Sequence, residues 1–226
     1  MEKLKLYPPL KQVKAFNSYP ETVDAFYKFD RGINKNNLFG ANEDYYFKNL
    51  GFKGGHNGID IACYPGTSIV ASLPSWVLEE HDEEADRKAG FGVILVSNDE
   101  YEWLDGSKSH CKSIYWHNQA NLCKVGEKVS TGQTIAYADN TGFSTGDHLH
   151  FMIKQCDKDG NTLNWNNGHA GAIDCYPYIQ YWDLNKMDTN DCEIDDELLE
   201  LLYQFGFNRK PDVQFWKGKS VKQFLK

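Results

Sequence analysis

Two histidines in the stretch 146–151, Gly-Asp-His-Leu-His-Phe, alternate with apolar residues. The side chains of a β-strand point to opposite faces in turn, so we expect His148 and His150 on one face and Leu149 and Phe151 on the other. Such a strand needs a core on one side and tolerates a polar site on the other. The pattern therefore predicts a half-buried sheet. Two unrelated surface histidines are the alternative, because short motifs often match by chance.

Short runs of β-branched and aromatic residues, separated by Gly and Asn, continue this pattern from Leu38 onward. The charged stretch 79–88 is expected to form a solvated loop or a short helical insertion. The sequence 157–161 resembles the start of a calcium loop, but Gly168 stands where the twelfth-position glutamate is required, so we expect a hairpin turn. The expected strands are 58–62, 67–71, 91–96, 113–117, 134–138 and 148–154.

Both ends of the chain differ in character from the middle. Residues 1–37 mix prolines, aromatics and charges, and we expect an arm packed on the domain, with a short helix at 21–29. Apolar residues at helical spacing between 194 and 205 predict a C-terminal amphipathic helix. The expected fold is mainly β. It consists of an antiparallel β-sheet or sandwich domain at 38–180, the N-terminal arm 1–37, and a C-terminal α-helix with a basic tail at 181–226.

Charge and cysteine content exclude several classes of protein. The formal net charge of −8 argues against a general nucleic-acid binder. The segment from Asn208 to Lys226 is basic; it either contacts an anionic polymer or is a solvated end. The six cysteines form no Cys-x-x-Cys pair and are expected to be free, buried residues. Neither a signal peptide nor a transmembrane run is recognisable, so a soluble, leaderless chain is expected.

A second motif, at 56–60, complements the first. The strand period places His56, Gly58 and Asp60 on one face, and Gly58 leaves room for an ion close to the backbone. With His150 this gives two histidines and one carboxylate. Zinc accepts such ligands, and three protein ligands with one open position are typical of a catalytic zinc site.

Two histidines remain for proton transfer. His148 precedes the ligand His150 by two residues, and His117 shares a strand face with Tyr115. Two imidazoles that do not bind the metal can accept a proton from zinc-bound water and donate to a developing oxyanion. No His-Glu-x-x-His motif offers a glutamate base instead. For His117 alone, an aromatic-flanked core histidine is the alternative.

These motifs together resemble the M23 metallopeptidases, the lysostaphin- and LytM-type peptidoglycan endopeptidases. The resemblance rests on His-Asn-Gly-Ile-Asp at 56–60, Tyr-Trp-His at 115–117, and Asn-Thr-Gly-Phe-Ser-Thr-Gly-Asp-His-Leu-His-Phe at 140–151. The stretches 125–136 and 90–96 are similar to a hairpin and a strand of the same family. The likeness extends from about Leu38 to Pro177.

The resemblance implies one Zn²⁺ per chain, bound by His56, Asp60 and His150 at the floor of a groove in a small, mainly antiparallel β fold. It implies that His117 and His148 are catalytic: they orient and deprotonate the metal-bound water and stabilise the tetrahedral intermediate. The implied substrate and partner is bacterial peptidoglycan, cut in its peptide stem or cross-bridge. Nucleic-acid binding and membrane insertion are not expected.

Three points limit what the resemblance implies. Asn118 stands where the family usually has leucine, and the interval from Asp60 to His117 is longer than in compact members, which leaves the substrate preference open. Lipoyl and biotinyl carriers have a similar hairpin, but Lys124 and Lys128 fit a modified lysine poorly. A catalytically silent binding or activating module, or a structural part of a phage particle, is the more serious alternative. Without a leader, we expect action at the cell wall after release by lysis or carriage in a phage particle.

Overall fold

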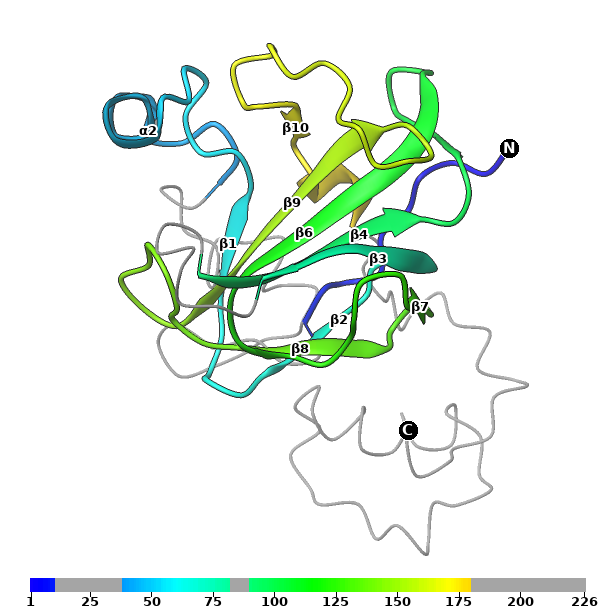
Figure 1. Ribbon diagram of the computed structural model, residues 1–226. Coiled ribbons are helices and arrows are strands. Elements are labelled where there is room, and N and C mark those ends of the chain that lie inside the picture. Colours follow the sequence, from blue (N-terminus) through cyan, green and yellow to red (C-terminus); the bar gives the residue numbers. More distant parts are fainter. Residues whose placement is uncertain (11–37, 82–89, 180–226) are drawn as a thin grey trace, which may run out of the picture.

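The computed structural model describes residues 1–10, 38–81 and 90–179, which form one antiparallel β-structure (Figure 1). The strand order is β1-β9-β6-β4-β3-β7, with β10 beside β9, β5 beside β6, and β8 between β6 and β2. The strands are β1 (Ile59–Ala62), β2 (Ser68–Val70), β3 (Ser75–His81), β4 (Phe91–Ser97), β5 (Tyr101–Glu102), β6 (Lys108–Asn121), β7 (Lys128–Val129), β8 (Thr134–Ala138), β9 (His148–Cys156) and β10 (Ala172–Ile173). The sequence-based expectation of a mainly antiparallel β fold is thus confirmed.

The long strands β6 and β9 form the centre of the sheet. Their register pairs Trp116 with His150 and Tyr115 with Phe151. Leu149, Phe151 and Ile153 on one face of β9 are fully buried in the main core. The alternation expected around His148 and His150 is therefore confirmed: their face of β9 is the site face, and the opposite face is core.

The sheet curls so that β8 and β2 lie below β6 and β9 in Figure 1. β6 makes this possible by pairing with β9 and β4 along most of its length and with β8 at its end. The β6–β8 register shifts between Asn118 and Ala120, and His117 has a φ of 70°. β6 therefore bends directly after His117, which turns this side chain toward the site.

Most expected strands match strands of the structure to within a few residues. Residues 134–138 agree with β8, and β6 and β9 extend further than expected. The expectation for the charged stretch 79–88 is wrong at its start, because Glu79–His81 belong to β3 and pair with β4. Cross-strand pairing overrides the charged composition there, since the side chains of these residues remain partly exposed to solvent.

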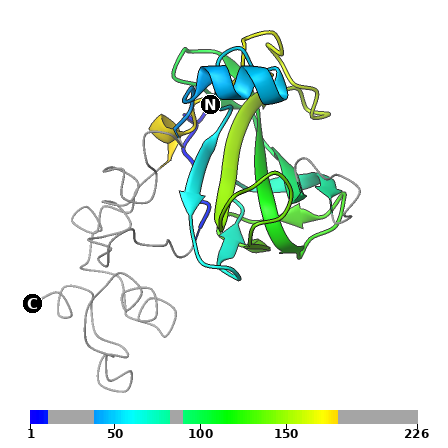
Figure 2. The same cartoon turned by 90° about the vertical axis from the view of Figure 1, so that its left-hand side faces the viewer.

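One helix was not expected. α2 (Glu43–Leu50) begins after Asn42, carries acidic residues in its first turn, and ends at Gly51 in the left-handed conformation. Figures 1 and 2 place it outside the sheet, beyond one end of β1. None of its side chains is buried, so periodic apolar patterning could not reveal it. A short 3₁₀ helix, Tyr176–Tyr178, follows β10.

The described part of the N-terminal arm packs on the domain as expected. Leu4, Leu6 and Leu10 are buried in the main core, and Leu6 bridges to Ile179. The short helix expected at 21–29 and the amphipathic helix expected between 194 and 205 lie outside the described residues. The division into 1–37, 38–180 and 181–226 stays a prediction.

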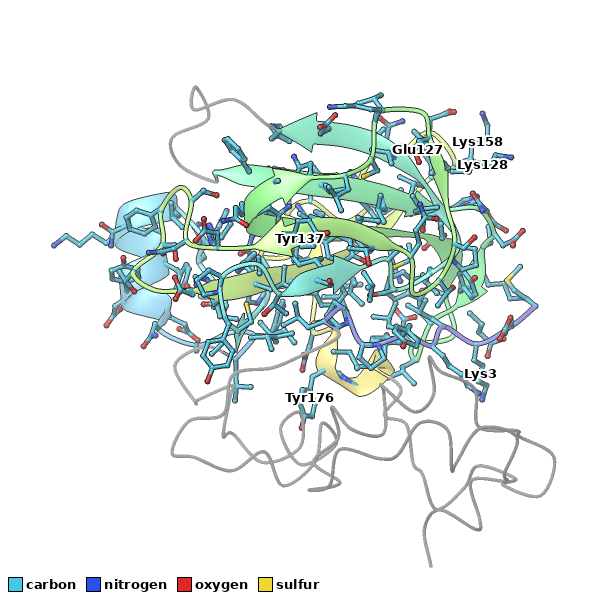
Figure 3. All side chains as sticks on the ribbon, turned by 90° about the horizontal axis from the view of Figure 1, so that it is seen from below. Lys3, Glu127, Lys128, Tyr137, Lys158 and Tyr176 are labelled. Carbon is cyan, nitrogen blue, oxygen red and sulfur yellow. The ribbon has the colours of Figure 1, made fainter. Side chains whose placement is uncertain are left out.

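Three smaller expectations are also answered. Five of the six cysteines are buried and free; Cys192 lies outside the described residues. Residues 157–161 form a turn whose Asp157 carboxylate accepts hydrogen bonds from the amides of Asp159 and Asn161. Figure 3 shows Lys158 of this turn at the end of the molecule away from α2. Among the described residues, no helix is long and apolar enough to cross a membrane.

Candidate active site

The seam between β1 and β9 brings the three expected metal ligands together. Asp60 is the register partner of His150, and His56 precedes β1 by three residues. The Asp60 Oδ1 atom lies 2.8 Å from His150 Nδ1 and 3.2 Å from His56 Nε2, and the two histidine nitrogens are 3.0 Å apart. Three donor atoms from two segments of the chain therefore point at one spot.

This spacing fits a zinc ion. Zinc binds nitrogen and oxygen at 2.0–2.2 Å, usually in a tetrahedron whose edges are then about 3.3 Å long. The three donor–donor distances, 2.8 to 3.2 Å, approach that edge length. A Cβ on Gly58 would lie 2.9 Å from the His150 imidazole and 2.6 Å from the Phe151 carbonyl oxygen. Only glycine leaves this space, as the sequence indicated.

Three hydrogen-bond contacts with the segment 38–41 fix the position of His56. The Gly40 amide donates to the His56 carbonyl (2.8 Å), and the His56 amide donates to the Ala41 carbonyl (2.9 Å). His56 Nδ1 lies 3.2 Å from the Leu38 carbonyl oxygen. Because a carbonyl only accepts, Nδ1 carries the hydrogen and Nε2 is left with the lone pair that a metal needs.

The two remaining histidines flank the ligands. The rings of His117 and His148 lie 4.7 Å apart, and His117 lies 6.0 Å from the ring of His150. His117 Nδ1 donates to the Thr141 carbonyl (2.7 Å), and His148 Nδ1 donates to the Gly146 carbonyl (2.7 Å). His148 Nε2 is 3.5 Å from Asp60 Oδ1. In the neutral tautomer of each of these two rings, Nδ1 therefore carries the hydrogen and Nε2 carries the lone pair of a base.

Burial and neighbouring side chains shift the pKa values of the site residues. Burial by itself raises the pKa of Asp60, but the His150 and His56 imidazoles beside its carboxylate outweigh this effect and hold the pKa well below its usual value. Burial lowers the pKa of His150, against the opposing effect of Asp60. Burial, reinforced by His150 and His148, lowers the pKa of His117 to about 3. At neutral pH the site thus combines the Asp60 carboxylate with neutral His117 and His150 imidazoles, and a carboxylate and a neutral imidazole are the forms that bind a metal.

A groove of about 570 Å³ lies over these residues. One wall is α2 with the segment that follows it, which contributes Tyr45, Tyr46, Leu50 and Phe52. The other wall is the loop 142–145, which precedes β9. Trp116 and Met152 complete the lining beside Asp60, His117, His148 and His150.

All five residues expected from the sequence therefore meet at one site. What the sequence reasoning missed is the wall opposite loop 142–145. Tyr46 stacks on His56 with ring centroids 4.9 Å apart, and burial, then the charge of Asp60, raises the pKa of its hydroxyl. A local signal for this wall exists: Asn42, two acidic residues and Gly51 bracket the helix in a pattern typical of helix ends.

The departure at Asn118 also has a structural role. Asn118 is fully buried, and its Nδ2 donates to Asn121 Oδ1 (2.9 Å). Its carbonyl oxygen accepts a hydrogen bond from Thr141 Oγ1 (2.8 Å). Asn118 thus ties the bend of β6 to the loop that receives the hydrogen of His117.

Comparison with known protein families agrees with this geometry. The sequence pattern of peptidase family M23 matches residues 54–165, about half of the chain. The chain belongs to peptidase family M23. The matched segment contains the three expected ligands and both helper histidines.

The names of the relatives describe different activities. The murein hydrolase activator NlpD of Escherichia coli is 34% identical over 50% of this chain and 26% of its own length. The peptidoglycan DD-endopeptidase ShyA of Vibrio cholerae is 30% identical over 52% of this chain and 24% of its own. The solved catalytic domain of lysostaphin from Staphylococcus simulans is 27% identical, with a TM-score of 0.43, over 56% of this chain and 80% of that domain. The chain spans about a quarter or less of the length of the curated relatives that it matches.

Proposed function

We propose that the chain is a zinc-dependent endopeptidase that hydrolyses peptide bonds in the stem or cross-bridge of bacterial peptidoglycan. The observation that supports this most is the convergence of His56 Nε2, Asp60 Oδ1 and His150 Nδ1 at the floor of an open groove. Two further imidazoles stand beside these atoms with free lone pairs. A site with only a structural role needs neither the groove nor the extra bases.

In this proposal each residue has a separate task. His56, Asp60 and His150 hold the zinc ion. When bound, zinc is a Lewis acid that polarises a carbonyl group and lowers the pKa of water. His148 and His117 accept the proton of the attacking water at Nε2 and return it to the leaving amine. Their Nδ1 atoms stay fixed on the Gly146 and Thr141 carbonyls, so neither ring changes its orientation during the transfer.

A binding or activating module without catalysis is the second candidate, favoured by the similarity to NlpD. Such a role requires no base next to the metal. The chain keeps all five residues, and both His117 and His148 line the groove beside Asp60 and His150. We therefore prefer the enzyme. Carriage in a phage particle and release by lysis stay predictions.

Digestion of purified peptidoglycan tests the proposed function. The chain is loaded with zinc, incubated with peptidoglycan of known cross-bridges, and the released fragments are identified by mass spectrometry. We expect new amino termini in the stem or cross-bridge, none of which appear with His56→Ala. His110→Ala is the matched control, because His110 lies at the far end of β6 and bonds to the Ser97 carbonyl. Equal digestion by His56→Ala, or none by any form, contradicts the proposal.

A further inference from the structure

Two lysines lie side by side on the site face of the sheet, outside the groove. Lys154 of β9 is the register partner of Lys112 of β6. Lys154 follows the candidate ligand His150 by four residues, which at about 3.3 Å per residue places it roughly 13 Å along the strand. The buried Met152 stands between them on the same face. Neither lysine lines the groove, so the pair is separate from the candidate active site.

The protein does not balance the positive charges of these two lysines. Like charges that face each other across two strands destabilise a sheet. Among the described residues, no carboxylate forms an ion pair with either lysine. The charge of Glu79 acts on Lys154, but its carboxylate lies 3.1 Å from His81 Nε2. Burial, then Lys112, lowers the pKa of Lys154 to about 8, which leaves Lys154 mostly charged at pH 7.

The cluster around the two lysines has more hydrogen-bond donors than acceptors. Lys112 Nζ donates to Thr162 Oγ1 (2.8 Å), and the hydroxyl group keeps its own hydrogen. Lys154 Nζ lies 4.9 Å from the centroid of the Trp165 ring and forms no hydrogen bond with any residue that the structure describes. An ammonium group has three hydrogens to donate and no lone pair. The cluster therefore lacks an acceptor that carries negative charge.

The loop that supplies Thr162 and Trp165 is fixed to the sheet. Thr162 forms a β-bridge with Cys156, the last residue of β9. A Cβ on Gly171 would overlap the Thr162 side chain, so the returning chain packs closely on this residue. Trp165 itself remains 59% exposed, at the surface of the molecule. The hydroxyl group is thus held in place while one wall of the cluster faces solvent.

We propose that Lys112, Lys154 and Thr162 form a binding site for a phosphate group. A phosphate group carries roughly −1.5 to −2 charges at pH 7 and three strong acceptor oxygens. Two ammonium groups supply the matching charge, and the hydroxyl group supplies a third donor. A carboxylate has a single charge and two oxygens, so it satisfies the cluster less well. The inference does not depend on the proposed peptidase function.

The loss of one charged donor sets the expected size of the effect. Lys112→Met and Lys154→Met keep most of the apolar stem and remove the ammonium group. Each is expected to weaken phosphate binding by roughly ten- to hundredfold, the range for hydrogen bonds to charged groups. Thr162→Val keeps the shape of the side chain and removes a neutral donor. It is expected to weaken binding by roughly two- to tenfold.

A titration with inorganic phosphate, followed by NMR at pH 7, tests the site. Phosphate replaces chloride at constant ionic strength, so that general screening stays the same. The signals to follow are the Trp165 indole N–H, identified by its loss in Trp165→Phe, and the Thr162 amide. Both are expected to shift to saturation in wild type. The indole of Trp116, which lines the groove, reports phosphate bound near the candidate metal ligands instead.

Lys108→Met is the matched control. Lys108 is an exposed lysine of the same strand, β6, and its register partner is Glu102 rather than a second lysine. Its substitution is expected to change the affinity for phosphate by less than about twofold, because exposed charges contribute little. The positions of the other indole signals check that each variant is folded. Because the three variants remove three different donors, one that fails to fold leaves two others to decide.

The outcomes are decisive in both directions. Signals of Trp165 and Thr162 that stay in place, or a shift of the Trp116 indole alone, overturn the site. So does an unchanged affinity in Lys112→Met and Lys154→Met, an equal loss in Lys108→Met, or acetate binding as tightly as phosphate. Glucose 6-phosphate then distinguishes the sources of the phosphate group. An affinity equal to that of inorganic phosphate shows that the site accepts a phosphate monoester of a larger molecule, and no binding shows that it takes the free ion.

Discussion

At the scale of single residues, His148 and His150 show how two identical side chains of one strand can be oriented differently toward the same carboxylate. Both lie on the site face of β9, yet they present different atoms to the same carboxylate oxygen. His150 offers Nδ1 at 2.8 Å, and His148 offers Nε2 at 3.5 Å. The reason is the Gly146 carbonyl, which occupies His148 Nδ1 and has no counterpart at His150.

This difference leads to a prediction for zinc binding. His150→Ala removes one of three ligand atoms, so zinc content after dialysis is expected to fall to a small fraction of one ion per chain. His148→Ala leaves the three ligands in place, so zinc content is expected to stay near one while turnover falls by roughly 10²–10⁴-fold. Atomic absorption and a peptide-release assay measure the two quantities. Equal zinc loss in both variants contradicts the division of roles.

At the scale of secondary-structure elements, the site depends on how closely β1 approaches β9. Gly58 stands at the entry to β1, where a methyl group would overlap both the Phe151 carbonyl and the His150 ring. The neighbouring carbonyl belongs to the backbone of a central strand and has little freedom to move. The strand pair and the metal ligands are therefore subject to the same steric limit.

Gly58→Ala is expected to lower both the stability of the protein and its affinity for zinc. Overpacking of this kind costs about 1–3 kcal/mol of unfolding free energy, and displacement of His150 lowers zinc affinity at the same time. Urea denaturation and a competitive zinc titration measure the two effects. Gly146→Ala is the control, since a Cβ there meets open space and its φ is not positive. Unchanged stability and zinc affinity in Gly58→Ala contradict this expectation, because they show that β1 can move away from β9.

The elements also show what the sequence could reveal. The strand at 148–154 was predictable because buried and site residues alternate along it. The convergence of His56 and Asp60 was predictable because Gly58 separates them at strand spacing. α2 was not predictable, because none of its side chains is buried and it has no apolar stripe. The hydrogen-bond acceptors on Leu38, Thr141 and Gly146 were hidden as well: they are main-chain carbonyls, which any residue type supplies.

At the scale of the whole molecule, the sheet has a second apolar cluster on its site face. Its buried members are Ile94, Ile114, Met152 and Ala172, and the partly buried Phe39, Leu78 and Trp116 pack against them. Further along the same face, Lys154 pairs in register with Lys112 and lies under the ring of Trp165, 4.9 Å from its centroid. Burial, then the charge of Lys112, lowers the pKa of Lys154 to about 8.

A buried lysine makes the stability of the fold depend on pH. The charged form of Lys154 is disfavoured in the folded state, and this cost of about 3 kcal/mol is fully present below pH 8 and disappears as pH rises toward 10.5. Lys154→Met is therefore expected to raise the unfolding free energy by roughly 1–3 kcal/mol at pH 7, after the lost cation–π contact is deducted. The gain is expected to shrink at pH 9.5. Urea denaturation at both pH values measures it.

The control for this experiment is Lys158→Met, because Lys158 is largely exposed and pairs only with Asp159. Its substitution is expected to change the unfolding free energy by less than about 0.5 kcal/mol at either pH. Other groups that titrate in this range cancel when each variant is compared with wild type at the same pH. A stabilisation by Lys154→Met that is the same at pH 7 and pH 9.5 contradicts the assignment of the cost to a buried charge.

Three of the four site histidines give their Nδ1 hydrogen to the main chain, at Leu38, Thr141 and Gly146. Every residue type has a main-chain carbonyl oxygen. Substitutions at these positions and in the groove walls therefore leave the acceptors of the three Nδ1 hydrogens in place. Residues of the groove walls such as Tyr45 and Phe143 can therefore be replaced while the three acceptors stay in place. The backbone conformation thus fixes the orientation of these three histidines, whatever side chains the residues at the acceptor positions carry.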